Sequence, residues 1–207
     1  MAGTMSLEDL IADLKETLHD AATVFESDDD AAFKRFLVQA LPDMETKRPL
    51  TRLGGVELQA GLPRYSLANV PDFAAYKTHL WDRCMPRPWE PGYPGALPRV
   101  SAARDDGQWW LLFDPAPTWK HIGALGYSFR FWYFGRHVLG AVAENTTIAE
   151  ADRGLLLLRA QVEAMRELAM RNAGKPVQMR DGVSGVARNS TPAALYEQLL
   201  RVFKETR

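Results

Sequence analysis

The chain has 207 residues, a net charge of −1, 46% hydrophobic residues and 25% charged residues. These values are typical of a globular protein with one domain and an insertion, or two small domains, and give no bulk electrostatic reason to expect nucleic acid or an acidic membrane as a partner. The single cysteine, Cys84, excludes an internal disulfide framework. No hydrophobic run approaches the roughly 20 residues that span a bilayer, so no membrane association is expected.

Two amphipathic helices are predicted at the start of the chain, as a helical hairpin within residues 6–50. Ser6 is placed to cap the first helix, whose hydrophobic residues recur at spacings of three and four as far as Phe25. After a polar break, Asp30 is expected to cap a shorter second helix, which Pro42 ends.

From residue 51 to residue 145 the composition favours strands, turns and loops. The clearest hairpin is Arg99–Phe113, in which two strand-like runs flank an Asp-Asp-Gly turn. A short helix is predicted over Asp72–Trp81. Five prolines between Pro86 and Pro98 exclude a helix or central strand there, and a second proline-marked loop, 115–119, is expected before the next strand. The first proline-rich loop is either pinned by its aromatic residues or presented to a partner.

The most aromatic run, residues 127–134, is predicted to be a strand. Alternation gives one wholly aromatic face, which is expected to be buried: Tyr127, Phe129, Phe131 and Tyr133. The other face mixes polar and aromatic groups and is expected to be partly wet: Ser128, Arg130, Trp132 and Phe134. Core packing is favoured over base stacking for this strand, because it holds one arginine and the chain is not basic.

A long helix over Ala149–Asn172 follows the aromatic strand. Thr146 and Thr147 are candidate caps, and Glu150 and Asp152 lie in the first turn, where the helix dipole favours acids. The helix is hydrophobic on several faces, which predicts several packed neighbours.

The last part of the chain is predicted to contain a small hairpin over 177–188 and a helix over Pro192–Thr206. Thr191 can cap this helix, and Pro192 is suited to its first position. One hydrophobic stripe runs along it and is the candidate binding surface: Leu195, Tyr196, Leu199, Leu200 and Phe203.

These elements predict an α+β fold in which a helical bundle is built from both chain ends and a β-rich region is inserted. The expected parts are a helical hairpin over 6–50, a β-rich insertion over 51–145, and residues 146–207, which complete the helical body or form a docking arm.

No catalytic or metal-binding signature is present. The four histidines, His19, His79, His121 and His137, are scattered without zinc-ligand spacing, and neither a phosphate-binding glycine loop nor a nucleophile elbow occurs. No catalytic residue, cofactor or metal is therefore expected. One alternative stays open: an enzyme whose site is assembled only by the fold, in the β insertion near His121, His137 and Cys84.

A resemblance to a known family lies at the long helix. The run from Thr146 to Leu158, TTIAEADRGLLLL, continues in Glu163–Ala169 and follows an aromatic strand that ends in Arg136-His137. This pattern resembles the head–tail connector (adaptor) proteins of tailed bacteriophages and related gene-transfer particles. The N-terminal helical pair, the β insertion and the terminal helix also resemble the larger members, so the likeness covers the layout of most of the chain.

The resemblance implies a structural protein of the virion neck. Such adaptors form a ring beneath the portal, commonly a dodecamer, extend the DNA channel and offer a platform for a tail, stopper or nozzle protein. DNA would pass through without specific binding, and the isolated protein is expected to be monomeric or weakly associated until it assembles on the portal. Under this interpretation the terminal helix is expected to dock on the portal. The remaining alternative is a non-viral interaction module that presents the proline-rich loop.

Overall fold

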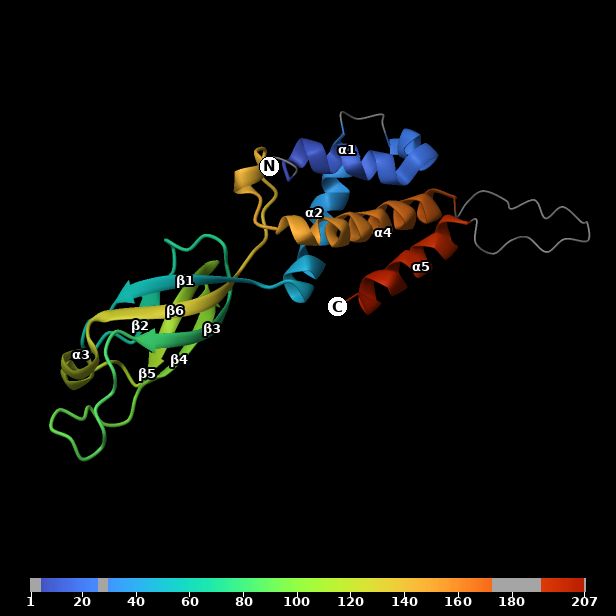
Figure 1. The fold of residues 1–207 in the computed structure, drawn as a ribbon. Helices are drawn as coiled ribbons and strands as arrows, with labels where there is room; N and C mark the ends of the chain where they lie inside the picture. The colour runs from blue at the N-terminus through green and yellow to red at the C-terminus, as the bar shows by residue number, and fades with distance from the viewer. Residues whose placement is uncertain (1–4, 26–29, 173–190, 207) are drawn as a thin grey trace, which may run out of the picture. The chain divides into compact units, whose positions relative to one another are not determined.

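The structure, a computed structural model, describes residues 5–25, 30–172 and 191–206 (Figure 1). The described residues form five α-helices and two antiparallel three-stranded sheets, which confirms the α+β class. They divide into two compact units: a helical unit within 1–48 and 137–207, and a β unit over 49–136. The hairpin expected over 177–188 lies outside the described residues.

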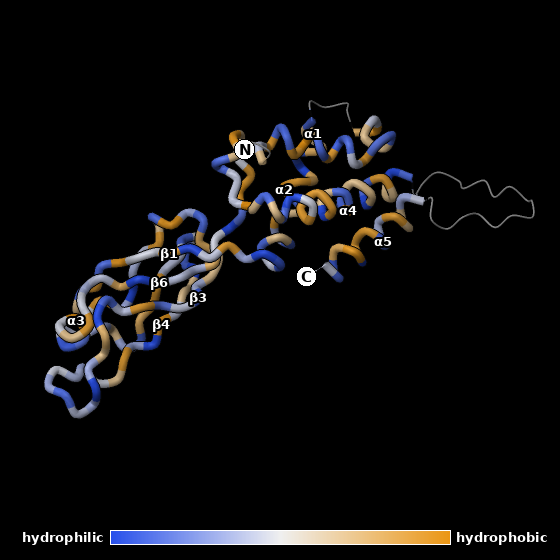
Figure 2. Tube along the Cα trace, viewed as in Figure 1, coloured by the Kyte–Doolittle hydropathy of each residue, from blue (hydrophilic) through white to orange (hydrophobic). Residues whose placement is uncertain are grey.

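The helical unit contains four α-helices among its described residues and three short 3₁₀ turns. The helices are α1 (Leu7–Leu18), α2 (Ala31–Lys47), α4 (Arg153–Asn172) and α5 (Pro192–Glu205). The turns are η1 (His19–Phe25), η2 (Ala143–Asn145) and η3 (Glu150–Asp152). In Figure 1, α5 (red) lies alongside α4 (orange). Figure 2 shows hydrophobic and hydrophilic stretches alternating along α1 and α5, as in helices with one apolar face.

Helix α4 is central to the core of the helical unit. Its fully buried residues include Leu156, Ala160 and Ala164, and they belong to one hydrophobic cluster with residues of α1, α2 and α5. The expectation that a helix with several hydrophobic faces needs several neighbours is met, since α1, α2 and α5 all pack against α4.

Two predicted features of α2 are wrong. Asp30 makes no capping hydrogen bond; its backbone is left-handed, with φ 61°, and its carboxylate instead pairs with Lys15. Pro42 lies inside α2, which continues to Lys47. Met44 beyond it is fully buried, so packing of the last turns outweighs the backbone hydrogen bond that proline removes.

The threonines before α4 do not cap it. The Thr147 hydroxyl donates to or accepts from the loop at His137 and Val138, and Thr146 donates to the Met5 carbonyl. These bonds hold the loop before the helix, and α4 begins only at Arg153, after the η3 turn. In contrast, the Ser6 and Thr191 hydroxyls cap α1 and α5 as predicted.

The β unit is built from two antiparallel sheets. One has the order β1 (Leu50–Glu57), β6 (Ser128–Gly135), β3 (Phe73–Trp81). The other has the order β2 (Arg64–Ser66), β5 (Gln108–Asp114), β4 (Arg99–Asp105). A short helix, α3 (Trp119–Leu125), precedes β6 in a segment expected to be a loop. Its Thr118 side chain accepts from the His121 backbone and so begins the helix.

The helix predicted over Asp72–Trp81 is wrong, because this segment is the edge strand β3. Its pairing with β6 shifts register between Phe73 and Ala75 and again between Tyr76 and Thr78. Each irregularity adds a residue, which places Phe73, Tyr76 and His79 opposite the buried side of β6. The resulting spacing of three imitates the period of a helix, so the sequence pattern alone indicates the wrong element.

Aromatic side chains fill the core of the β unit. Phe129 and Phe131 of β6 are fully buried, as predicted, and Phe129 meets Phe113 edge to face with ring centroids 4.9 Å apart. Phe73 stacks on Tyr133 at 5.4 Å. Tyr127, also expected in this face, is 60% exposed because β6 begins one residue later.

Gly54 of β1 is expected to tolerate no side chain, whereas the adjacent Gly55 is expected to tolerate one. A Cβ at position 54 would lie 2.7 Å from the Phe131 ring, but a Cβ at 55 would meet only the Phe129 carbonyl at 3.6 Å. We expect Gly54→Ala to destabilise the β unit by about 1–3 kcal/mol through overpacking. Gly55→Ala is the matched control in urea denaturation, and equal stability losses for the two variants would contradict the packing described here.

Candidate interaction surfaces

The stripe predicted on α5 lies mostly against its own helical unit. Phe203 is 4% exposed and belongs to the core, and three other residues of the stripe are partly buried against that core: Leu195, Tyr196 and Leu199. Leu200 instead lines a shallow hollow on the outward side. The structure therefore separates one residue of the predicted binding surface from the other four.

Two cations hold the end of α5. The Lys47 ammonium lies 5.0 Å from the centre of the Phe203 ring, and the Arg159 guanidinium lies 5.9 Å from it. Lys47 also donates to the carbonyls of Lys204, at 3.0 Å, and Thr206, at 2.5 Å. A cation at the carbonyl end of a helix satisfies otherwise unpaired acceptors and complements the helix dipole. The C-terminal end of α5 is thereby fixed to α2 and α4.

Lys47, Arg159 and Phe203 together form an anchor for the end of α5. Arg159 links this anchor to a buried acid, Glu163. Its guanidinium donates to Asp43 of α2 and, at 2.6 Å, to Glu163 one turn along α4. Glu163 is 6% exposed and also accepts from Arg166 at 3.1 Å. Burial alone would lower the pKa of Arg159, but hydrogen bonds and charges from Asp43 and Glu163 outweigh it and raise that pKa. Arg159 is therefore a permanent cation in the anchor.

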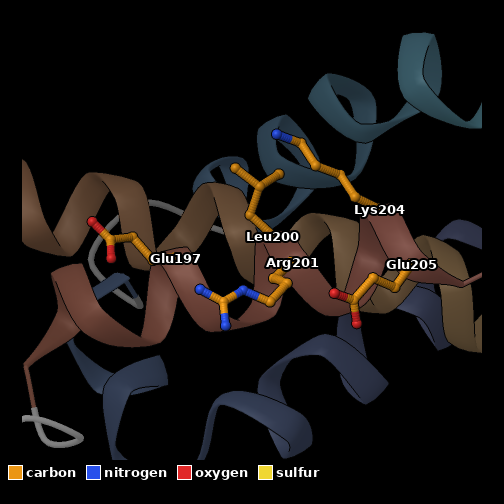
Figure 3. A pocket seen from close by; sticks show the side chains of 5 residues that line it. All are labelled: Glu197, Leu200, Arg201, Lys204 and Glu205. Atoms are coloured by element: carbon orange, nitrogen blue, oxygen red, sulfur yellow. The ribbon is translucent and has the colours of Figure 1, made fainter.

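On the outward side of α5, charged side chains surround Leu200. Five side chains line its hollow: Glu197, Leu200, Arg201, Lys204 and Glu205. Figure 3 shows Leu200 and Lys204 rising on the same side of the helix. A small apolar centre with charges of both signs around it is the usual composition of a modest protein contact.

The other half of α5 covers a second, more apolar hollow of about 440 Å³ within the helical unit. Its walls come from α1, η1, α4 and α5: Thr17, Leu18, His19, Ala21, Gln161, Met165, Leu168, Pro192, Leu195 and Leu199. Leu195 and Leu199 of the predicted stripe are therefore two of its walls.

A second candidate surface lies at one end of the β unit, where the proline-rich loop meets α3. The His121 ring is buried; its Nε2 bonds the Ala96 carbonyl at 3.1 Å and its Nδ1 accepts from the Thr118 backbone. Arg83 donates its backbone N–H to the Leu125 carbonyl at 3.0 Å. The loop is therefore fastened to α3, yet Trp89 and Trp119 are 75% and 78% exposed. Large exposed aromatics on a fixed support are typical of binding surfaces.

The residues considered for an enzyme site are divided between the two units: His137 belongs to the helical unit, and His121 and Cys84 belong to the β unit. His121 holds the proline-rich loop, and both ring nitrogens of His137 are bonded, to Thr147 and to the Arg48 carbonyl. Cys84 is exposed and shares a hollow with His79. Burial lowers the pKa of His79, whose ring meets the Tyr76 hydroxyl and tilts over Phe129. These histidine contacts have ready structural roles.

Within 5–25, 30–172 and 191–206, no group of three or more His, Cys, Asp or Glu side chains is placed to hold a metal ion. None of the helices described in those ranges is long and hydrophobic enough to cross a membrane.

Comparison with protein-family models finds no match for this chain, and comparison with curated proteins finds none either.

Sequence reasoning found the stripe of α5 but missed its anchors. Arg159 and Glu163 have the spacing of a helical ion pair, a signal that the sequence does carry. Lys47 lies 157 residues before its acceptor at Lys204, and no local pattern marks that contact.

Proposed function

We propose that this chain is a structural adaptor of a virion neck, which forms a ring beneath the portal of a tailed bacteriophage or related particle. In this proposal the ring extends the DNA channel and provides the platform for a tail or stopper protein. The body of each subunit is a helical bundle built from both chain ends, with the β unit inserted.

The proposal rests on helix α4 and on the segment of the chain that leads into it. The segment with the connector-like pattern, Thr146–Leu158, leads into a helix against which three other helices of its unit pack. The aromatic strand β6 and the Arg136-His137 pair precede it, separated from it by residues 138–145, in the order that the resemblance implies. A rigid helical body with exposed aromatic residues elsewhere suits an assembly role, which requires contacts and no reacting group.

Portal docking is assigned to the outward side of α5. Since Phe203 is part of the core, the whole stripe is free only if α5 leaves its unit, whereas Leu200 and its charged neighbours are accessible with α5 in place. The contact is therefore proposed to centre on Leu200, with Arg201 and Lys204 beside it.

The test is co-assembly with the portal protein of the same particle. We expect the isolated chain to be monomeric at micromolar concentration and to co-sediment with portal rings. Leu200→Asp is expected to abolish co-sedimentation while the thermal melt stays unchanged. Val38→Asp, on α2 at a residue that is 49% exposed, is the matched control and should co-sediment normally. A folded wild-type chain that never joins the portal would refute the adaptor function.

One observation favours a second candidate, an interaction module outside any virion. The pair of exposed tryptophans, Trp89 and Trp119, lies on the fixed loop and helix at one end of the β unit. Binding of a partner that is abolished in Trp89→Ala and Trp119→Ala, but not in Leu200→Asp, would favour this function over portal docking.

A further inference from the structure

The outer face of the β1–β6–β3 sheet carries a strip of aromatic residues that lies outside the core of the β unit and is partly open to solvent. It comprises the alternate residues of β6 that point away from the core, namely Arg130, Trp132 and Phe134. The register sets Trp132 between Leu53 and Thr78, and the flanking Leu53 and Leu80 are 53% and 54% exposed. We call these residues the open sheet face.

Small neighbours flank Phe134 and Arg130 on this face. Phe134 lies between Thr51 of β1 and Ala75 of β3, and Arg130 lies opposite Gly55, which has no side chain. Trp132 and Phe134 are both partly exposed although they occupy the central strand. The inward residues of the same strand, Phe129 and Phe131, are fully buried, so the two faces of β6 differ sharply.

Cations accompany the rings. The Lys77 ammonium lies 5.2 Å from the centre of the Phe134 ring, and Arg130 is exposed on the same strand as Trp132. Within β1, β3 and β6 the only acid is Glu57, paired with Ser128 at one end of the sheet. The surrounding β unit has ten Lys and Arg against seven Asp and Glu, although the whole chain has a net charge of −1. The face therefore favours an anionic occupant.

We propose that the open sheet face binds single-stranded nucleic acid, with bases stacked on Trp132 and Phe134 and phosphates paired with Arg130 and Lys77. Stacking on aromatic side chains combined with cations along the backbone is how sequence-tolerant single-strand binders work. This activity does not depend on the adaptor function.

The geometry of the strand fits this ligand. Alternate residues on one face of a strand are about 6.8 Å apart, which is of the order of the step between nucleotides in an extended single strand. Arg130, Trp132 and Phe134 thus form a row with one cation and two stacking rings in register. The sequence alone shows one arginine in this strand, whereas the fold adds Lys77 from β3.

The experiment measures fluorescence anisotropy of a labelled oligothymidylate of about 20 nucleotides, longer than the roughly 4–16 nucleotides that one small binding domain covers. The full chain is titrated at about 50 mM and about 200 mM salt, and affinity should fall with salt as phosphate contacts require. Trp132→Ala and Phe134→Ala are each expected to weaken binding about tenfold or more.

Trp110→Ala removes an equally large, partly buried aromatic residue from β5, in the other sheet of the same unit, and is the matched control, expected to bind as the wild type does. Because Trp132 is partly buried, a second pair of variants keeps the test independent of folding. Lys77→Glu and Arg130→Glu change exposed residues and should leave the thermal melt unaltered. Each should lower the slope of log affinity against log salt by about 0.7 for every phosphate that the protein no longer neutralises.

Absence of binding by the wild type at low salt would overturn the proposal, as would folded Trp132→Ala and Phe134→Ala variants that bind like the wild type. Sedimentation of the same proteins tests the competing possibility, that a second copy of this chain binds the open sheet face. If the chain self-associates, Trp132→Ala abolishes that association and no oligonucleotide binds, the open sheet face is a protein interface and not a nucleic-acid site.

Discussion

Phe203→Ala is expected to lower the free energy of unfolding of the helical unit by about 3–5 kcal/mol, the usual cost of deleting a fully buried phenylalanine. The ring is 4% exposed, and the same substitution removes the aromatic surface on which Lys47 and Arg159 rest. Urea denaturation followed by circular dichroism measures the change.

Val202→Ala is the control for this prediction, because Val202 is the adjacent residue of α5 and is 44% exposed. It should change stability by no more than about 0.5 kcal/mol. If the two variants were equally stable, α5 would not be held by Phe203, and the stripe of α5 would be free for a partner as the sequence alone suggests. The same reasoning makes Phe203→Asp unsuitable as a docking variant, since unfolding would imitate loss of binding.

Arg159→Ala is the second substitution expected to have a large effect, about 3 kcal/mol, because it removes the buried partner of Glu163 and leaves that carboxylate with only the exposed Arg166. The remaining charge is the Glu163 carboxylate, whose side chain is 7% exposed. The same variant also deprives Asp43 and Phe203 of the guanidinium beside them.

Arg166→Ala is the matched control, since Arg166 binds the other oxygen of Glu163 from a position where its own side chain is 61% exposed. An exposed ion pair contributes about 0–1 kcal/mol, so this variant should melt close to the wild type. Chemical denaturation of both variants at one pH gives the comparison. A destabilisation in Arg166→Ala as large as that in Arg159→Ala would contradict this prediction, because the buried ion pair would then contribute no more to stability than the exposed one.

The sequence correctly predicted those helix starts that depend only on neighbouring residues. Ser6, Thr191 and Pro192 start α1 and α5 as expected, because a cap depends on residues three apart. The failures arise where tertiary contacts override a local rule. The bulges in β3 give a strand the period of a helix, and packing of Met44 carries α2 past Pro42.

The sequence likewise predicted only part of each candidate surface. Helical periodicity identified the stripe of α5, but only the fold shows that Phe203 faces Lys47 and Arg159, which lie far away along the chain. Alternation along β6 separated its two faces correctly from Phe129 onward, while the cation from β3 depends on a register that the sequence does not reveal.

The discontinuity of the helical unit has a consequence for synthesis on the ribosome. The β unit is one uninterrupted stretch, 49–136, and can fold as soon as that stretch has emerged. Residues 5–47 emerge earlier, but their hydrophobic faces can be buried only after α4 and α5 have been synthesised. The ion pair between Arg35 and Glu167, for example, joins positions 132 residues apart. During that interval the faces of α1 and α2 are exposed to chaperones and to other nascent chains, so the yield of folded protein depends on how quickly the last third of the chain is translated.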